Sequence, residues 1–283
     1  MQNNKTSPHE MANKEQTTVY VKGRNGFSCP LHWQQVLVWA VSLGNVALVF
    51  TIFLMQKVLP RGVTTSVLVV FSLLSCMIVI VNYWVTAACV QDPIIQKQLN
   101  FKALGKRFST KKAGVDGRNL NLWCNLCKAF VNDSTKHCGI CNQCTLSFDH
   151  HCNWLNNCIG AENYWTFWRL VWLMFAFEII CLVTAVLIFV DKTFAANRAF
   201  FITTVTVSIL NLAALISLID LIRFHSFLQE KDISTFDWIR FKREGQLKKR
   251  ELSKEKYEEW EKEFFEKNGS RGFYKGKVIV DSR

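Results

Sequence analysis

The sequence predicts an all-α membrane protein with four transmembrane helices and a small zinc-bound, cysteine-rich cytosolic domain between the second and third helices. Three observations predict this fold. Half of the 283 residues are hydrophobic, which is high for a soluble domain and ordinary for helices in lipid. Lys and Arg are divided unevenly between the connections, and seven of the 11 cysteines fall between positions 124 and 158.

Four apolar stretches are each long enough to cross a hydrocarbon core of about 30 Å. They comprise residues 33–55, 64–91, 165–190 and 199–222. A helix buried in a soluble core is the alternative for a single stretch, but it does not explain four of them together. Arg169 and Glu178 interrupt the third stretch. An ionisable residue within a span is a candidate functional group, and for Glu178 a hydrogen bond between helices is the more modest explanation.

The basic residues predict the orientation of the chain. The connections at 56–61 and 191–198 hold two Lys or Arg residues each, whereas 92–163 holds nine and the chain after Ile222 holds sixteen. By the positive-inside rule, both termini and the middle loop face the cytosol. The net charge of +12 then indicates attraction to the lipid bilayer. Nucleic acid is not an expected partner, because the charges are not gathered on one soluble module.

The chain accordingly divides into five parts. These are a cytosolic N-terminal arm (1–32), a membrane hairpin (33–91), a cytosolic loop (92–163), a second membrane hairpin (165–222) and a cytosolic tail (223–283). The tail contains a charged segment at 239–267, with Asn268-Gly269 after it as a helix stop. Its apolar residues recur at helical spacing and include Tyr257, Trp260 and Phe264. This stripe predicts docking within the protein, with a membrane-surface helix as the alternative.

The middle loop is dense in cysteine and histidine after Trp123. From Cys124 to Cys158 the order is C-x2-C, nine residues, H-C-x2-C-x2-C, four residues, D-H-H-C, five residues and C. Disulfides do not persist in the cytosol, so a cluster this dense indicates metal binding or catalysis. Two tetrahedral zinc sites need eight ligands and the segment offers ten, which leaves one thiol and one imidazole.

A free thiol beside an imidazole is what nucleophilic cysteine catalysis requires, since the thiolate attacks and the histidine accepts its proton. Counting does not identify the remaining pair, and a purely structural zinc module with two idle side chains is the alternative. Four cysteines lie outside the cluster, namely Cys29, Cys76, Cys89 and Cys181. They are most simply small apolar residues, although Cys29 and Cys89 lie near the cytosolic face and are candidates for acylation.

These residues resemble the cysteine-rich domain of the DHHC family of protein S-acyltransferases, or palmitoyltransferases. The series C-x2-C-x9-H-C-x2-C-x2-C-x4-D-H-H-C-x5-C-x4-N-x3-F is matched at every position from Cys124 to Phe167, with Asn163 as its Asn. The cysteine-rich zinc domain is therefore placed at 122–167. Four spans with the cluster between the second and third are also similar to that family, so the resemblance covers nearly the whole chain.

The resemblance implies two zinc ions and a role for each remaining residue. One zinc would be held by Cys124, Cys127, His137 and Cys144, and the other by Cys138, Cys141, His151 and Cys158. The pair left over is His150 and Cys152. By resemblance, Cys152 is the nucleophile, His150 its general base and Asp149 the group that orients and polarises His150.

Two outer motifs depart from the family pattern. Asp92-Pro93-Ile94 stands where the family often has Asp-Pro-Gly, and this change removes a turn glycine. Ser234-Thr235-Phe236-Asp237 stands where it often has Thr-Thr-x-Glu, and it keeps a hydroxyl pair, Ser234 and Thr235, and the carboxylate of Asp237. A structural role against the catalytic domain is expected for the second motif.

The activity that the resemblance implies is transfer of a long-chain fatty acyl group from acyl-CoA, through a thioester on Cys152, to cysteines of membrane-associated proteins. Lys128, Lys136 and Arg169 border the cluster and are candidate ligands for the CoA phosphates, with interfacial snorkelling as the alternative. Family habit places such a protein in the endoplasmic reticulum or Golgi membrane. Two rivals are a zinc-bearing scaffold without catalysis, against which the intact Asp-His-His-Cys run argues, and a transporter or channel, which leaves the metal cluster unexplained.

Overall fold

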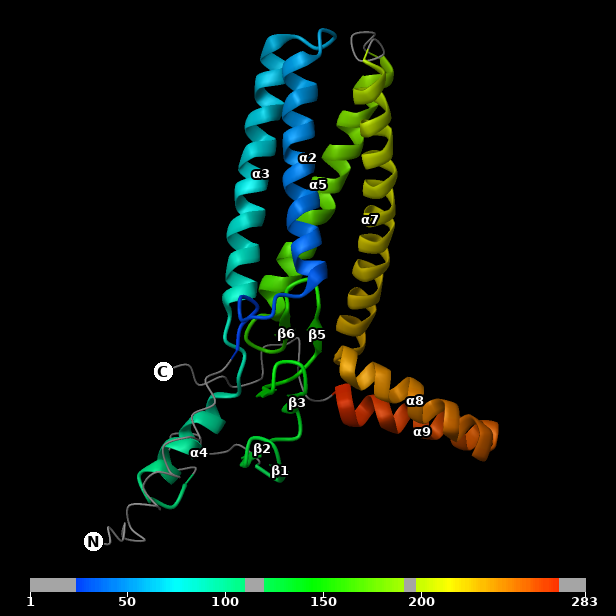
Figure 1. Cartoon of the computed structure of the whole chain (residues 1–283). Helices are drawn as coiled ribbons and strands as arrows, with labels where there is room; N and C mark the ends of the chain where they lie inside the picture. Colours follow the sequence, from blue (N-terminus) through cyan, green and yellow to red (C-terminus); the bar gives the residue numbers. More distant parts are fainter. Residues whose placement is uncertain (1–23, 110–119, 191–196, 270–283) are drawn as a thin grey trace, which may run out of the picture.

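Four long helices form the bundle that dominates the computed structural model, which describes residues 24–109, 120–190 and 197–269 (Figure 1). They are α2 (Trp33–Met55), α3 (Arg61–Ala87), α5 (Tyr164–Val190) and α7 (Arg198–Lys231). All four are long and apolar enough to cross a membrane. The predicted fold class, with the cysteine-rich segment between the second and third spans, is confirmed.

Two of the spans differ from their predicted bounds. α3 begins at Arg61, directly after Pro60, and it ends at Ala87 because Ala88 has the extended dihedrals φ −56° and ψ 126°. α7 continues past residue 222 to Lys231. Its last turns leave the apolar pattern but remain helical, since His225 and Leu228 are buried against the cysteine-rich domain and α5.

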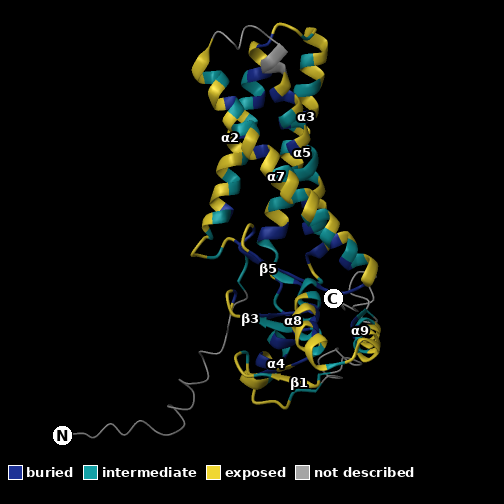
Figure 2. Cartoon of the chain, turned by 90° about the vertical axis from the view of Figure 1, so that its right-hand side faces the viewer, coloured by how far each residue is buried: buried dark blue, intermediate teal, exposed yellow. Residues whose placement is uncertain are grey.

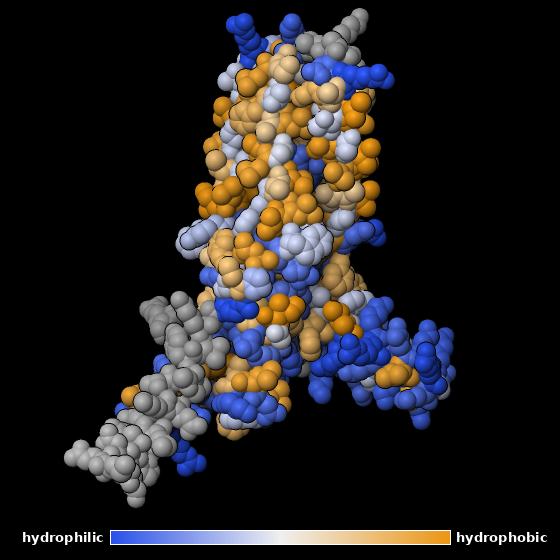
Figure 3. Space-filling view, in the orientation of Figure 1, coloured by the Kyte–Doolittle hydropathy of each residue, from blue (hydrophilic) through white to orange (hydrophobic). Residues whose placement is uncertain are grey.

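The outer face of the bundle is apolar. Figure 3 shows hydrophobic residues covering the long helices and hydrophilic residues on the parts below them, and Figure 2 shows that many outward-facing residues of these helices are exposed. Exposed large apolar side chains occur on every span, among them Leu43, Leu73, Val183 and Leu212. Such a surface is unfavourable in water and favourable in hydrocarbon, so the chain is a multi-pass membrane protein.

Polar side chains lie inside the bundle. Asn45 of α2 and Asn211 of α7 are both buried and exchange two hydrogen bonds of 3.0 Å. Glu178 of α5 is also buried, and its Oε2 makes no hydrogen bond among the described residues. The amide pair links the first and last spans where no water competes, whereas the role of Glu178 stays a prediction.

The chain between α3 and α5 forms one short helix and three antiparallel hairpins. The helix is α4 (Pro93–Ala103). The hairpins pair β1 (Leu122–Cys124) with β2 (Ala129–Val131), β3 (Lys136–Cys138) with β4 (Gln143–Thr145), and β5 (His150–Cys152) with β6 (Asn157–Ile159). Each turn contains a residue at positive φ, respectively Lys128, Asn142 and Asn156. In each of the first two hairpins, the first cysteine of a C-x2-C pair ends a strand and the second lies in the following turn.

The sequence pattern did not reveal α4, and this helix explains the missing turn glycine. Asp92 is its N-cap and accepts a hydrogen bond of 3.0 Å from the Ile94 N–H. Ile94 is fully buried against the first hairpin, and the Gln98 amide both donates to the Phe130 carbonyl and accepts from its N–H. The residue after Asp92-Pro93 thus lies in a helix whose packing requires an apolar side chain.

Residues 235–269 of the tail form a helical hairpin rather than one helix. α8 (Thr235–Glu251) and α9 (Lys254–Gly269) are separated at Leu252, which is extended. The apolar stripe of α9 faces α8: Trp260 stacks on Phe241 with ring centroids 5.4 Å apart, and Phe264 lies 5.2 Å from the same ring. A Cβ on Gly245 would meet the Tyr257 hydroxyl at 3.2 Å, so glycine permits this close approach. Docking within the protein is therefore confirmed for the stripe.

Candidate metal centres and catalytic site

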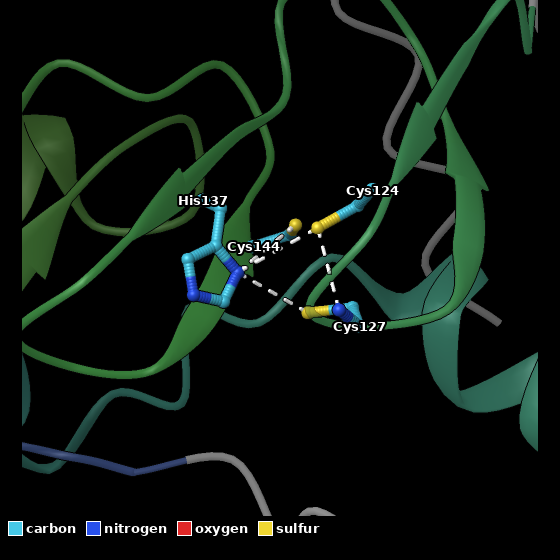
Figure 4. Close-up of side chains that lie close together, drawn as sticks. All are labelled: Cys124, Cys127, His137 and Cys144. Atoms are coloured by element: carbon cyan, nitrogen blue, oxygen red, sulfur yellow. Dashed lines mark hydrogen bonds between the residues drawn. The ribbon is translucent and has the colours of Figure 1, made fainter.

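Four side chains from the first two hairpins converge on one point (Figure 4). They are Cys124 of β1, Cys127 of the following turn, His137 of β3 and Cys144 of β4. The Nδ1 atom of His137 lies 3.7 Å from the sulfur of Cys124, 3.4 Å from that of Cys127 and 3.7 Å from that of Cys144. Tetrahedral zinc with bonds of about 2.0 to 2.3 Å sets its ligand atoms roughly 3.5 to 3.8 Å apart. The cluster fits one such ion.

A second cluster has the same composition and size. It comprises Cys138 of β3, Cys141 of the following turn, His151 of β5 and Cys158 of β6. The Nδ1 atom of His151 lies 3.8, 3.3 and 3.8 Å from the three sulfurs in that order. The second hairpin therefore contributes to both clusters, and its position is fixed from two sides. Both groups have the membership that the family resemblance implied.

The crowded thiols perturb one another. The hydrogen bond with Cys144 lowers the pKa of Cys127 to about 5, against the effect of burial. The hydrogen bond with Cys138, together with burial, raises the pKa of Cys141 to about 11. Thiols held this close cannot all ionise by themselves, whereas a divalent cation at the centre would ionise each of them. The donor chemistry of both clusters is thus that of a metal site.

Asp149, His150 and Cys152 lie outside both clusters and form a line of carboxylate, imidazole and thiol. Nδ1 of His150 donates to Oδ2 of Asp149 at 2.7 Å, and the Cys152 thiol interacts electrostatically with the same ring. With Nδ1 bound to the carboxylate, Nε2 is the nitrogen left for the thiol. Asp149 and Cys152 are both buried, which strengthens the electrostatic interactions within the line.

The line favours proton transfer from the thiol to the imidazole. Burial disfavours the charged form of His150, but the hydrogen bond with Asp149 and the electrostatic interaction with Cys152 outweigh it and raise the pKa of His150 to about 10. Burial likewise opposes the charge of Asp149, yet the hydrogen bond from His150 lowers the pKa of this carboxyl. An imidazole of this basicity is a strong acceptor for the Cys152 proton.

The start of α8 supports the carboxylate. The N–H of Thr235 donates to Oδ1 of Asp149 at 2.7 Å, and the Thr235 hydroxyl donates to Oδ2 at 2.9 Å. Ser234 caps α8 by accepting from the Asp237 N–H, and its hydroxyl donates to the Asp237 carboxylate. The Ser-Thr-Phe-Asp motif therefore aligns a helix N-terminus with Asp149, where its positive end favours negative charge.

Comparison with known proteins agrees with this geometry. A sequence model described as DHHC palmitoyltransferase matches residues 118–242, a range that contains both clusters, the Asp149–His150–Cys152 line and the start of α8. The chain contains a DHHC palmitoyltransferase domain at residues 118–242. The DHHC assignment accounts for the metal clusters, which a transporter or channel leaves unexplained, and nothing in the comparisons favours an inactive scaffold.

Similar curated proteins carry the same family name. Probable palmitoyltransferase ZDHHC11B of Homo sapiens is 28% identical over 92% of this chain and 78% of its own length. Palmitoyltransferase ZDHHC11 of Homo sapiens is 28% identical over 84% of this chain and 64% of its own. For palmitoyltransferase ZDHHC18 of Homo sapiens, 30% identity extends over 46% of this chain and 35% of that protein. These DHHC relatives therefore share different lengths of the chain.

The outer residues of the DHHC motif contact the hairpin that carries Asp149, His150 and Cys152, and they link the segments around it. Asn163 accepts from the Gly160 N–H at 3.1 Å and donates to the Cys158 carbonyl at 3.0 Å, which fixes the turn before α5. The ring of Phe167 packs edge-on against His150 with centroids 5.5 Å apart. Asp92 accepts a hydrogen bond of 2.7 Å from Thr135, which joins the loop after α3 to the second hairpin.

Sequence reasoning missed two asparagines that attach the DHHC hairpin to the membrane bundle. Nδ2 of Asn157 lies 3.0 to 3.2 Å from the carbonyl oxygens of Val85, Thr86 and Ala88. Nδ2 of Asn156 lies 3.2 to 3.3 Å from those of Gly26, Ser28 and Pro30. Val85, Thr86 and Ala88 lie at the C-terminal end of α3, where carbonyls lack a donor from a following helical turn, so the Asn157 amide helps to satisfy them. The signal available in the sequence was the pair Asn156-Asn157, which begins four residues after Cys152.

Sequence reasoning also missed His225 of α7. It is buried, and its ring centroid lies 5.9 Å from that of His150. With Asp149 and His150 it forms a third group of donor atoms, all within 4.8 Å of one another. It lies in α7, whose sequence predicts a membrane-spanning helix, and no local sequence pattern connects it to the DHHC segment.

The three basic residues assigned to CoA come from separate elements. Lys128 lies in the β1–β2 turn, Lys136 in β3 and Arg169 in the second turn of α5. Lys136 donates to the Asp133 carbonyl at 2.6 Å, and its amine lies 5.6 Å from the centre of the Phe236 ring. Their assignment to acyl-CoA stays a prediction.

Proposed function

We propose that the chain is a protein S-acyltransferase that transfers a long-chain acyl group from acyl-CoA to cysteines of membrane-associated proteins. The observation that carries the proposal is the line Asp149–His150–Cys152 beside the membrane bundle. Between Cys124 and Cys158, Cys152 is the one thiol that belongs to neither metal cluster. It is also the thiol that contacts a carboxylate-bound imidazole.

In the first half of the reaction, His150 accepts the Cys152 proton and the thiolate attacks the thioester carbonyl of acyl-CoA. The bond between the acyl carbon and the CoA sulfur breaks, and the CoA thiolate takes the proton back from the imidazolium. Asp149 remains ionised and holds the imidazole in the tautomer whose Nε2 faces the thiol. The product is an acyl thioester on Cys152.

In the second half, a cysteine of the substrate protein gives its proton to His150 and attacks that thioester. The acyl group moves to the substrate sulfur, and Cys152 leaves as a thiolate that recovers the proton. One thioester replaces another in each half, so the chemistry needs no external energy source. The protein has to supply a thiolate, positioning and a site from which water is excluded.

The surroundings of Cys152 suit an acyl chain. Its side chain packs in one apolar cluster with Phe167 and Leu170 of α5 and Leu228 of α7. Because each buried CH₂ contributes about 0.8 kcal/mol, a palmitoyl chain on this sulfur is most stable among the spans. A substrate cysteine must then approach along the membrane surface, which limits the substrates to membrane-associated proteins.

Two structural zinc ions are the proposed metals. Three thiolates and one imidazole form a donor set that selects zinc over calcium or magnesium. When bound, each ion would hold two hairpins together and take no part in acyl transfer. Removal of metal is therefore expected to act on the catalytic line through its supporting fold.

The remaining proposals concern topology and ligands. The Lys and Arg distribution supports cytosolic termini and a cytosolic site, and family habit supports the endoplasmic reticulum or Golgi. The division into an arm (1–32), two membrane hairpins, the loop (92–163) and a tail after residue 222 is proposed on the same basis. Lys128, Lys136 and Arg169 are the proposed contacts of the CoA phosphates.

Labelling with acyl-CoA tests the proposal. Purified full-length protein in lipid is incubated with labelled palmitoyl-CoA, denatured and treated with neutral hydroxylamine, which cleaves thioesters. We expect a labelled adduct that hydroxylamine removes. If folded protein containing two zinc ions per chain stays unlabelled, the inactive scaffold is the correct interpretation.

Thr235→Val tests the support of the catalytic carboxylate. Valine keeps the shape of the side chain and the backbone hydrogen bond but removes the hydroxyl that donates to Asp149. The loss of one charge-assisted hydrogen bond corresponds to about 1.5 kcal/mol, or roughly a 10-fold slower formation of the adduct. Thr235→Ser keeps the hydroxyl and is the matched control. Equal rates of adduct formation in the valine and serine variants would show that the Thr235 hydroxyl does not contribute to the reaction.

A further inference from the structure

A hydrogen-bond chain extends from the half-buried Gln229 of α7 to the first turn of α5. Nε2 of Gln229 donates to the Tyr164 hydroxyl oxygen at 3.2 Å, and that hydroxyl lies 3.1 Å from Nδ1 of His225. Tyr164 and His225 are 2% and 1% exposed. Water therefore does not complete these hydrogen bonds, and the protein groups must satisfy one another.

The hydrogen-bond chain favours one protonation state of His225. The Tyr164 oxygen accepts from Gln229, and donation of the Tyr164 hydrogen to Nδ1 of His225 gives each of these three groups a partner. Nδ1 then acts as an acceptor, and a neutral imidazole carries its proton on Nε2. The side chain is thus held as one tautomer that presents an N–H on the edge away from Tyr164.

The catalytic line lies within reach of this imidazole. Asp149, His150 and His225 each offer a donor atom within 4.8 Å of the other two. The rings of His150 and His225 have centroids 5.9 Å apart, and the Phe167 ring lies 5.5 Å from the first and 5.4 Å from the second. Two histidines and a phenylalanine therefore pack as one group around the Asp149 carboxylate.

We propose that His225 is a positioning residue, held by Tyr164 as the Nε2–H tautomer, that keeps the Asp149–His150 pair aligned on Cys152. The inference rests on the proposed acyltransferase function and extends it to a residue outside the Asp-His-His-Cys run. In this proposal the dipole of its N–H acts on the Asp149 carboxylate, which offers an oxygen within 4.8 Å of a nitrogen of the His225 ring. Contacts from α5 and α7 therefore help to orient His150 while it accepts and returns a proton.

A packing role is the competing explanation, because His225 contacts several aromatic rings, including Trp168 and Phe224. The two roles make different demands on the side chain. Packing needs a flat ring, which phenylalanine supplies. Positioning needs an N–H donor near the place of Nε2, which the longer amide of glutamine supplies.

The test compares His225→Phe and His225→Gln in full-length protein in lipid. Two rates are measured: adduct formation with labelled palmitoyl-CoA, and alkylation of Cys152 by iodoacetamide at neutral pH, followed by mass spectrometry. Alkylation reports on the thiolate without needing the acyl substrate. Zinc content and thermal unfolding are recorded for each variant. Phe224→Leu, a change at the neighbouring position that leaves the hydrogen bonds of His225 in place, is the matched control.

We expect His225→Phe to slow both rates about 10-fold with two zinc ions retained, and His225→Gln to stay within about 3-fold of wild type. Tyr164→Phe should also slow both rates, and the double variant with His225→Phe should be no slower than His225→Phe alone, since the two residues act as one unit. The inference is overturned if His225→Phe reacts at the wild-type rates, or if His225→Gln reacts no faster than His225→Phe. If wild type forms no adduct, the acyltransferase proposal fails, and alkylation alone decides whether His225 acts on Cys152.

Discussion

Replacing Cys152 with alanine is expected to abolish the hydroxylamine-sensitive acyl adduct and to leave both metal clusters loaded. The sulfur is the atom that bonds to the acyl carbon, so no neighbouring group can take over its role. It belongs to neither cluster, and the change removes one buried sulfur from the end of β5. The loss of rate should exceed about 1,000-fold, the scale on which an enzyme without its nucleophile falls.

Two further substitutions identify the sulfur as the reacting atom. Cys152→Ser keeps the position and offers oxygen, a much poorer nucleophile at neutral pH, and any adduct formed on it would be an ester that neutral hydroxylamine leaves intact. Cys181→Ala removes a buried thiol of α5 that lies outside the site and should label as wild type does. A hydroxylamine-sensitive adduct that persists at full rate in Cys152→Ala would refute the proposed relay.

The exposed thiols of Cys29 and Cys89 are further possible sites of acyl label, so their contribution has to be separated from labelling of Cys152. Both are exposed, and the sequence places them near the cytosolic membrane face. A Cys29→Ala, Cys89→Ala background tests whether they accept acyl groups from Cys152. If they do, the double variant should carry less total label than wild type, and the initial rate of labelling at Cys152 should be unchanged.

The sequence predicted the parts of this protein that depend on local pattern. Uncharged runs identified the spans, because hydrocarbon excludes charge along a whole helix. The short C-x2-C steps identified metal binding. Seven cysteines and three histidines exceed the eight ligands of two zinc sites, which left one thiol and one imidazole. It was the family resemblance that named the pair as Cys152 and His150. The structure groups the other eight donors in the same two sets.

The parts that escaped prediction depend on contacts between distant segments. α4 is short and only weakly apolar along its length, and it is stabilised by packing of Ile94 and Ile95 against the first hairpin. α7 runs beyond its apolar stretch because Leu228 packs with the cluster around Cys152. His225 has no local signal of function, since its neighbours Tyr164 and His150 are supplied by other elements. No periodicity within one segment encodes such contacts.

Replacing Cys158 with alanine is expected to release one of the two zinc ions and, with it, most of the acyl adduct. Cys158 is fully buried in β6, directly opposite His151 in β5, and its sulfur lies 3.4 Å from that of Cys141. Zinc binding is worth on the order of 10 kcal/mol to folding in small zinc domains, so a site with three ligands loses much of what orders the hairpin. β5 also carries His150 and Cys152, and these two lose their alignment when the strand pair loosens.

Metal analysis and labelling should therefore fall together in this variant. We expect close to one zinc per chain instead of two, a lower unfolding temperature and adduct formation slower by at least about 100-fold. Cys76→Ala, which removes an exposed thiol on the lipid-facing part of α3, is the matched control and should retain both ions. A chelator that strips wild type should reproduce the effect, and zinc should reverse it. Full activity in Cys158→Ala with one zinc per chain would show that the catalytic line does not depend on the second metal centre.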